Sequence, residues 1–304
     1  MELLKKLCKI HSPSGEEFRI KEFLIKYINS NKQNWKTQPQ LVCGEDFQDC
    51  LMLVFGKPRT MIFAHMDSVG FNVRYEKEII KIGGPVTENN TILHGKDKTG
   101  NIECKLKVDK ESKKLSYQYK RNIERGTSLI FKQEFIEDKE TIQSCFLDNR
   151  LGIWVMLKLA ETLENGIIAF TCWEEHGGGS VAVLTKYIYE TYKIKNSLIA
   201  DITWITNGVK PGKGVVISQR DKMIPRKKYF EKILSIAKDN NIDYQIEVEE
   251  NGGSDGSELQ KLPYPIDWCF IGAAEENVHS PNEKVNKKDV NSMLKLYETL
   301  MVNL

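Results

Sequence analysis

Residues 167–176 read Ile-Ile-Ala-Phe-Thr-Cys-Trp-Glu-Glu-His, an apolar run that leads directly into two acidic residues and a histidine. The run Ile167–Trp173 predicts a buried strand, because it is short, apolar and bounded by polar residues. The glycines that follow, Gly177–Gly179, allow the backbone to turn tightly or to approach a ligand. Adjacent carboxylates at the end of an apolar strand repel one another, so Glu174 and Glu175 indicate a functional site.

Strand and helix patterns alternate around this stretch. A helix is predicted over Leu151–Leu163, and Gly166 is a natural residue to follow its end. Such alternation favours an α/β fold in which a mixed sheet is flanked by helices. The same reasoning predicts strands at Leu51–Phe55, Met61–Ala64, Leu198–Ile202, Val215–Ser218, Tyr244–Val248 and Trp268–Ile271, and further helices over 230–237 and 290–304.

A helix is also expected near the N-terminus. Apolar residues spaced three and four apart between Ile20 and Ile28 would form one helix face. The preceding sequence Ser14-Gly15-Glu16-Glu17 is typical of a capping box, in which a side chain at each end of the first turn satisfies a backbone N–H group. We therefore predict a helix that begins at this segment.

Residues 69–143 have no convincing helical pattern. Short β-rich runs are separated there by turn signals such as Gly-Gly and Asn-Asn. The simplest interpretation is a small all-β domain, inserted into a catalytic domain formed by residues 1–68 and 144–304. Its exposed strand edges would pack against another subunit, so we expect a homo-oligomer.

The composition is that of an ordinary globular enzyme. The chain has 304 residues, a net charge of +2 and 40% hydrophobic residues, and its lysine clusters are interleaved with acidic residues. Neither a nucleic-acid partner nor a membrane partner is expected, because there is no basic arm and no apolar run of about 20 residues. The seven cysteines are odd in number and scattered, and the first residues lack a signal-peptide pattern, so we expect a reduced, cytoplasmic protein.

His65 directly follows the predicted strand Met61–Ala64. The carboxyl end of a strand is where open α/β sheets place their sites. Asp67 could accept the second N–H of the imidazole and fix its tautomer, as metal-bound histidines usually require. Taken alone, the pattern also fits a structural histidine.

Three more residues occupy comparable positions. Asp148 precedes a predicted helix, where an N-cap is the simpler interpretation, and Asp201 and His279 follow apolar strands. Two imidazoles and three carboxylates suit two Zn²⁺ or Co²⁺ ions that share one carboxylate, and Mn²⁺ is also compatible. Glu174 would then be free to act as a base, and the predicted ligands are His65, Asp148, Glu175, Asp201 and His279.

Six motifs occur in order along nearly the whole chain: Ala-His65-Met-Asp67, Leu-Asp148-Asn-Arg, Trp-Glu174-Glu175-His, Ala-Asp201-Ile-Thr, Gly252-Gly253-Ser254-Asp255 and His279-Ser-Pro-Asn-Glu283. This ordered set resembles the M42 family of metallo-aminopeptidases, which includes glutamyl-aminopeptidase and tetrahedral-aminopeptidase relatives. The resemblance implies a di-zinc exopeptidase fold with an inserted β domain. It also implies peptide substrates with free N-termini.

The resemblance further implies roles for individual residues. His65, Asp148 and Asp201 would bind one metal ion, and Asp148 would also bind a second ion together with Glu175 and His279.

The remaining motifs carry the other implied roles. Glu174 would be the general base, and Asp67 would support His65. The Asp148–Asn149 peptide is expected to be cis, and Gly252–Asp255 would line the substrate pocket. The insert is shorter than is usual in the family, which argues against a large tetrahedral assembly.

Two alternative functions use similar residues. Amidohydrolases and carboxypeptidases of the M20 type have a similar ligand order, but they carry their extra domain between the last two ligands. Here the long gap separates His65 from Asp148 (83 positions), which favours the M42 arrangement. A catalytically silent metal-binding scaffold of the same fold would be expected to have lost a ligand or the base, and none is lost.

Overall fold

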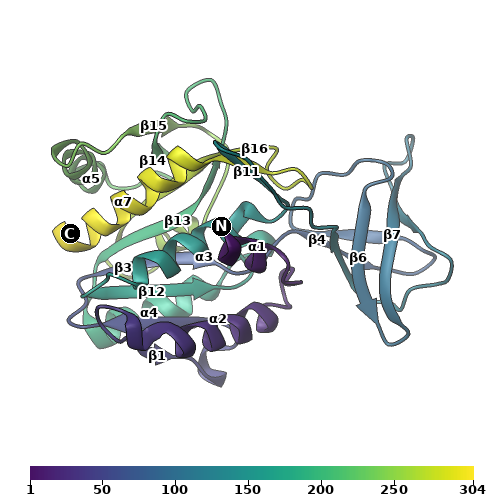
Figure 1. The fold of residues 1–304 in the computed structure, drawn as a ribbon, viewed down its shortest axis with the longest axis horizontal. Helices are drawn as coiled ribbons and strands as arrows, with labels where there is room; N and C mark the ends of the chain where they lie inside the picture. The colour runs from purple at the N-terminus through teal and green to yellow at the C-terminus, as the bar shows by residue number, and fades with distance from the viewer.

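The computed structural model describes residues 1–304 and contains two β-sheets, one of eleven strands and one of six. The larger sheet lies among the helices, and the smaller sheet projects from it to one side (Figure 1). The predicted mixed α/β fold with a small additional β-sheet is therefore confirmed. None of the helices combines the length and the apolar character needed to span a bilayer.

The larger sheet is formed by β1 (Gln40–Val42), β2 (Leu51–Phe55), β3 (Thr60–His65), β10 (Ile136–Glu137), β11 (Thr141–Gln143), β12 (Gly166–Thr171), β13 (Asn196–Trp204), β14 (Val215–Arg220), β15 (Tyr244–Val248), β16 (Asp267–Glu276) and β17 (Lys284–Asn286). Its main path is β1-β2-β12-β3-β13-β16-β17-β11-β10, and β14 and β15 extend from β16. The four central strands β12, β3, β13 and β16 are parallel, whereas β2, β14 and β17 are antiparallel to their neighbours in this core.

The helices are α1 (Glu2–Cys8), α2 (Phe18–Asn31), α3 (Leu147–Ala160), α4 (Ser180–Tyr192), α5 (Lys227–Asp239), α6 (Gly256–Leu259) and α7 (Lys287–Asn303), with short 3₁₀ turns η1 (Lys32–Asn34), η2 (Glu45–Phe47) and η3 (Glu174–His176). Helices α3 and α7 contact each other and pack on the central strands, and α4 and α6 form a second pair. Every residue of β2, β3 and β12 is buried, so both faces of this part of the sheet are covered.

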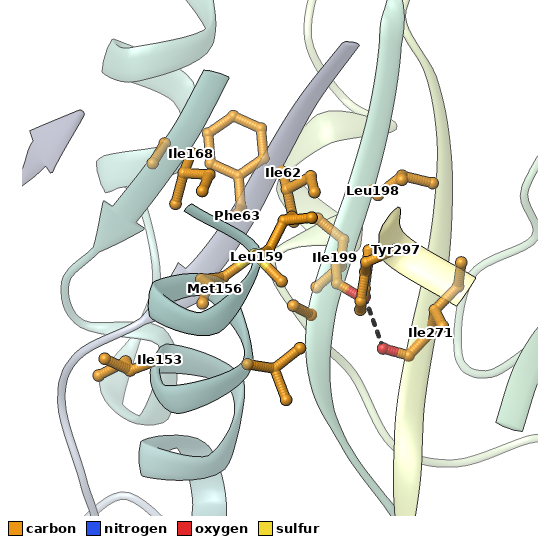
Figure 2. Close-up of a cluster of buried hydrophobic side chains, with 14 of the residues drawn as sticks. Ile62, Phe63, Ile153, Met156, Leu159, Ile168, Leu198, Ile199, Ile271 and Tyr297 are labelled. Atoms are coloured by element: carbon orange, nitrogen blue, oxygen red, sulfur yellow. Dashed lines mark hydrogen bonds between the residues drawn. The ribbon is translucent and has the colours of Figure 1, made fainter. Parts of the chain in front are cut away.

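The core between α3 and the sheet is continuous and mostly aliphatic. Figure 2 shows Ile153, Met156 and Leu159 of α3 beside side chains of the central strands. Tyr297 of α7 brings a hydroxyl into this core, where it lies 2.8 Å from the carbonyl oxygens of Ile199 and Ile271. A buried phenol requires such a partner, and here it holds α7 against β13 and β16.

The smaller sheet is formed by β4 (Gly70–Val73), β5 (Ile79–Ile82), β6 (Ile92–Asp97), β7 (Gly100–Val108), β8 (Leu115–Gln118) and β9 (Ser128–Phe131), in the order β5-β4-β9-β6-β7-β8. It has its own apolar core, in which the Phe71 and Phe131 rings meet edge to face. Strands β10 and β11 lie outside this sheet, because β11 pairs with β17 and its Ile142 is buried in the main core.

The predicted capping box near the N-terminus does not form. Helix α2 begins at Phe18 and has no side-chain cap. The hydroxyl of Ser14 instead donates to the Asp67 carboxylate at 2.6 Å, and Glu17 accepts hydrogen bonds from the backbone of Gly15 and Trp173. Charge-assisted tertiary hydrogen bonds are stronger than a local cap, so these side chains turn toward the carboxyl ends of the central strands.

Candidate metal centre

The parallel strands bring the predicted residues to one edge of the sheet. His65 is the last residue of β3, in register with Thr171 at the end of β12. Asp201 lies on β13, the other neighbour of β3. The prediction that Asp201 ends its strand is wrong, because β13 continues to Trp204; its side chain nevertheless reaches His65.

A first group of side chains contains His65, Asp148 and Asp201. The His65 Nε2 atom lies 3.1 Å from Asp148 Oδ1 and 3.5 Å from Asp201 Oδ2. All three residues are buried, and one potential ligand atom from each lies within 4.8 Å of the others. These are nitrogen and oxygen donors in an arrangement that can hold a divalent ion.

A second group contains Asp148, Glu175 and His279. His279 Nε2 lies 3.1 Å from Asp148 Oδ2 and 3.1 Å from Glu175 Oε2. Asp148 therefore belongs to both groups and turns one oxygen toward each histidine. It does not cap α3: the helix has no side-chain cap, and the Asp148–Asn149 peptide at its start is cis.

The neighbouring Glu174 and Glu175 diverge. The prediction that both leave on one strand is wrong, because β12 ends at Thr171 and the two glutamates lie in η3. Trp173, with a φ of 63°, has the left-handed backbone that starts this turn. Glu174 belongs to neither ligand group; its Oε2 lies 3.9 Å from His65 Nε2, and the side chain borders the cavity described below.

Asp67 connects several parts of the centre. Its Oδ1 lies 3.3 Å from His65 Nδ1 and accepts the backbone N–H of Glu174 at 3.2 Å. Its Oδ2 accepts the backbone N–H of Glu175 at 3.0 Å and the hydroxyl of Ser14. The carboxylate is fully buried, so it orients the imidazole from the side opposite Asp148 and also fixes the turn η3.

Further buried charged residues surround the centre. The sequence patterns assigned them no role. The Arg150 guanidinium donates to the carbonyl oxygens of Met66 and Asp67. Glu283 accepts the backbone N–H of Asp148 at 3.2 Å. Arg150 lies in the motif Leu-Asp148-Asn-Arg and Glu283 in the motif His279-Ser-Pro-Asn-Glu283, so their places in these motifs could have indicated a role at the site. Glu17 was instead interpreted as part of a capping box.

The carboxylates of the centre outnumber its cations, and their pKa values reflect this. In the protein without ions, burial and the nearby Asp148 charge raise the pKa of Glu175 to about 7. Burial likewise raises the pKa of Asp201 to about 6. For Asp148, hydrogen bonds with His279 and His65 outweigh burial and hold its pKa below the usual range. Crowded buried carboxylates of this kind are stable when a cation lies among them.

The residues present fit a metal centre. The two groups offer imidazole nitrogens and carboxylate oxygens, the donors that Zn²⁺ and related ions prefer. The Oε1 atom of Glu175 is buried and has no hydrogen-bond partner in the protein. An ion among these side chains would compensate both the unpaired oxygen and the repulsion between carboxylates.

A cavity of about 230 Å³ opens from the centre. Its wall includes Asp148, Glu174 and Asp201, together with Gly252 and Gly253. Asp255 does not line this cavity; it is buried and accepts the Thr171 hydroxyl at 2.6 Å. The metal groups therefore face a space that is continuous with the surface and bounded by the predicted glycines.

Comparison with known proteins decides the family. The family profile described as M42 glutamyl aminopeptidase matches residues 75–296. The chain belongs to the M42 peptidase family. This M42 peptidase is therefore a metal-dependent aminopeptidase, a hydrolase, and the M20-type alternative is not favoured.

Individual relatives cover almost the whole chain. A protein of Acetivibrio thermocellus named "Putative aminopeptidase" is 28% identical over 331 residues, which cover 97% of this chain and 96% of the relative. The aminopeptidase APDkam598 of the archaeon Desulfurococcus kamchatkensis has a TM-score of 0.85 at 22% identity, covering 100% of this chain and 94% of its own.

The Pyrococcus horikoshii TET1 peptidase, described as able to assemble into a tetrahedron or a large octahedral shell, has a TM-score of 0.82 at 23% identity. The match covers 100% of this chain and 99% of that one. At such identities, the structural matches show that the fold of this M42 peptidase is shared along its whole length.

Proposed function

We propose that this M42 peptidase uses two divalent metal ions to remove N-terminal residues from peptides with a free amino end. The observation that carries the proposal is the position of Asp148, whose two oxygens each lie 3.1 Å from a different histidine. One ion would be held by His65, Asp148 and Asp201, and the other by Asp148, Glu175 and His279. The donor set suits Zn²⁺ best, and Co²⁺ or Mn²⁺ are alternatives.

When bound, such ions polarise a peptide carbonyl and lower the pKa of water from 15.7 toward 7. Glu174 would act as the general base: its carboxylate takes a proton from the attacking water and later gives it to the amine that leaves. The location of Glu174 on the cavity wall, outside both ligand groups, supports this role. Asp67 would hold the His65 ring and the turn that carries Glu174.

The acidic lining near the metal groups also bears on the type of peptidase. Asp148, Glu174 and Asp201 border the cavity, so its wall is rich in carboxylates. A free amino terminus is complementary to this environment, because it is cationic when protonated and offers a lone pair when neutral. An acetylated terminus is a neutral amide whose nitrogen lone pair is delocalised into the carbonyl group. We therefore infer action on the first residue of a peptide and not within the chain.

We further propose that residues 1–68 and 144–304 form the catalytic domain and that residues 69–143 form an inserted module, whose last two strands, β10 and β11, pair within the larger sheet. The separate apolar core of the smaller sheet supports this division. Several large apolar side chains near this module are exposed, including Tyr75, Ile80 and Val86, which supports assembly into a homo-oligomer. All seven cysteines are free, which supports a reducing cytoplasmic location.

A panel of aminoacyl-chromophore substrates tests the activity. Metal-stripped protein should be inactive and should recover hydrolysis when Zn²⁺, Co²⁺ or Mn²⁺ is added. The matched N-acetylated substrates should remain uncleaved. Absence of hydrolysis with every substrate and every metal would support the silent-scaffold alternative instead.

A further inference from the structure

The loop that follows β5 of the smaller sheet reaches the second group of metal-binding side chains. It consists of Gly83, Gly84, Pro85 and Val86, and we call it the glycine loop. The smaller sheet supplies no residue to either metal group. The glycine loop nevertheless brings this sheet into contact with the centre.

Two backbone hydrogen bonds attach the glycine loop to the centre. The Val86 N–H donates to the carbonyl oxygen of His279 at 2.9 Å, and the Gly83 N–H donates to His176 Nδ1 at 3.1 Å. His176 belongs to η3, the turn that also carries Glu175. The loop therefore holds both segments from which the second group takes the ligands that it does not share with the first.

Neither glycine of the loop could carry a side chain without displacing part of the second group. A β-carbon at Gly84 would lie 3.3 Å from Nδ1 of His279, which is closer than nine in ten such contacts in proteins. A β-carbon at Gly83 would lie 2.9 Å from the carbonyl oxygen of Glu175, and Gly83 has a left-handed φ of 67° that favours glycine. In each case the nearest neighbour is a ligand of the second group.

His279 depends on such support more than His65 does. Its φ is 62°, which is uncommon for a residue other than glycine, and 24% of its side chain is exposed, compared with 1% for His65. The orientation of a metal-binding imidazole is normally fixed at its second ring nitrogen. For His65 this contact is Asp67, whereas Nδ1 of His279 faces Gly84.

We propose that the glycine loop positions Glu175 and His279 and thereby sets the affinity of the second metal ion. This inference rests on the proposed function, because it presumes that a second ion binds. Gly83 and Gly84 touch no ion themselves and act only through the two ligands. A side chain at position 84 would push the imidazole of His279 out of place, whereas the first group would keep its geometry.

Competition with a chromogenic chelator measures Co²⁺ binding to the full-length chain, and the Co²⁺ absorption spectrum is recorded at each equivalent. Gly84→Ala should weaken the second equivalent about 10- to 100-fold, the range typical for losing a residue that orients a ligand, and leave the first unchanged. Gly208→Ala is the matched control, because a β-carbon there would meet no atom closer than 3.9 Å; it should bind both ions like the wild type.

Equal weakening of both equivalents by Gly84→Ala, or wild-type affinity for both, would overturn the inference and leave the proposed two-ion function intact. A wild type that binds fewer than two equivalents would overturn both.

Combination with ligand variants separates positioning from a general loss of stability. In His279→Ala the imidazole that faces Gly84 is absent, so adding Gly84→Ala should not weaken Co²⁺ binding further. In His65→Ala, which leaves the second group, Gly84→Ala should weaken the remaining equivalent by the same factor. An equal effect in both backgrounds, or no effect in His65→Ala, would contradict the inference.

Gly83 provides an independent pair of variants. Gly83→Ala should also weaken the second equivalent selectively, because its β-carbon would meet the Glu175 carbonyl oxygen. Gly126→Ala is the control for backbone strain, because Gly126 has a left-handed φ of 80° and open space around it; it should bind both ions like the wild type. Wild-type affinity for both ions in Gly83→Ala would count against the glycine loop.

Discussion

The Asp67 carboxylate accepts the backbone N–H of Glu175 at 3.0 Å. The same carboxylate lies 3.3 Å from His65 Nδ1, so one buried side chain connects the end of β3 with the turn η3. A change at Asp67 should therefore disturb both metal groups, although Asp67 belongs to neither.

Replacing Asp67 by Asn should weaken metal binding about 10- to 100-fold, the range typical for losing a residue that orients a ligand. The amide cannot accept as many hydrogen bonds, so His65 and the turn η3 both lose support. Competition with a chromogenic chelator measures the effect. Asp97→Asn is a useful control, because Asp97 is a carboxylate with 1% side-chain exposure that pairs with Arg121 in the smaller sheet. An equal loss of affinity in the control variant would rule out a specific role for Asp67.

The wild-type chain should bind two equivalents of Co²⁺ or Zn²⁺ because Asp148 is shared by two groups of ligands. His65→Ala should weaken one site and His279→Ala the other, so each variant should retain about one tight equivalent. Elemental analysis after gel filtration provides the count. Saturation of the wild type at a single equivalent would remove Asp148 from a bridging role.

Metal removal should destabilise the protein, and more so as the pH rises. In the ion-free protein the pKa of Glu175 is raised from 4.5 to about 7, and that of Asp201 from 3.8 to about 6. A raised carboxyl pKa gives stability that is complete at low pH and is lost as the pH rises through the folded-state value. Bound ions would offset this loss of folding stability, because they stabilise the ionised carboxylates of Glu175 and Asp201. The Tm difference between metal-loaded and chelated protein should therefore widen between about pH 4 and pH 7; a constant or narrowing difference would contradict the account.

The oligomeric state can be tested through the exposed apolar residues near the smaller sheet. Light scattering should give a mass that is a multiple of the monomer mass. Ile80→Lys should shift the protein toward the monomer, because Ile80 is 49% exposed and its side chain would otherwise be buried between subunits. Lys81→Glu is a control on the adjacent, solvent-facing position. A monomeric wild type over a wide concentration range would contradict the proposed assembly.

The elements of the central sheet could be predicted because their sequences agree with their environment. Ile167–Phe170 is apolar throughout and lies between two strands, and α3 is apolar and buried along most of its length. The capping-box prediction is wrong because Ser14 donates to Asp67 and Glu17 accepts the backbone N–H of Trp173. These tertiary bonds use the same kinds of side chain as a capping box. The short strands β10 and β11 carry too few residues for a pattern to show.

The candidate centre followed from acids and histidines near strand ends, since parallel strands gather such residues at one edge. Two other carboxylates that line the cavity could not be predicted in this way. Glu247 lies on β15 and Asp221 directly after β14, where their sequence resembles a solvent-exposed surface. The Thr203 hydroxyl donates to Glu247, a tertiary contact that spacing along the chain does not encode.

The most direct test of the central claim is the turnover of Glu174→Gln with its metal content measured on the same sample. Glu174 lies outside both ligand groups, so the variant should retain the metal content of the wild type and bind substrate. Its kcat should fall about 10²–10⁴-fold, as expected when a general acid–base group is lost, whereas Glu175→Gln should lose metal together with activity. Full turnover by Glu174→Gln, or loss of metal from it while Glu175→Gln keeps both ions, would contradict the mechanism.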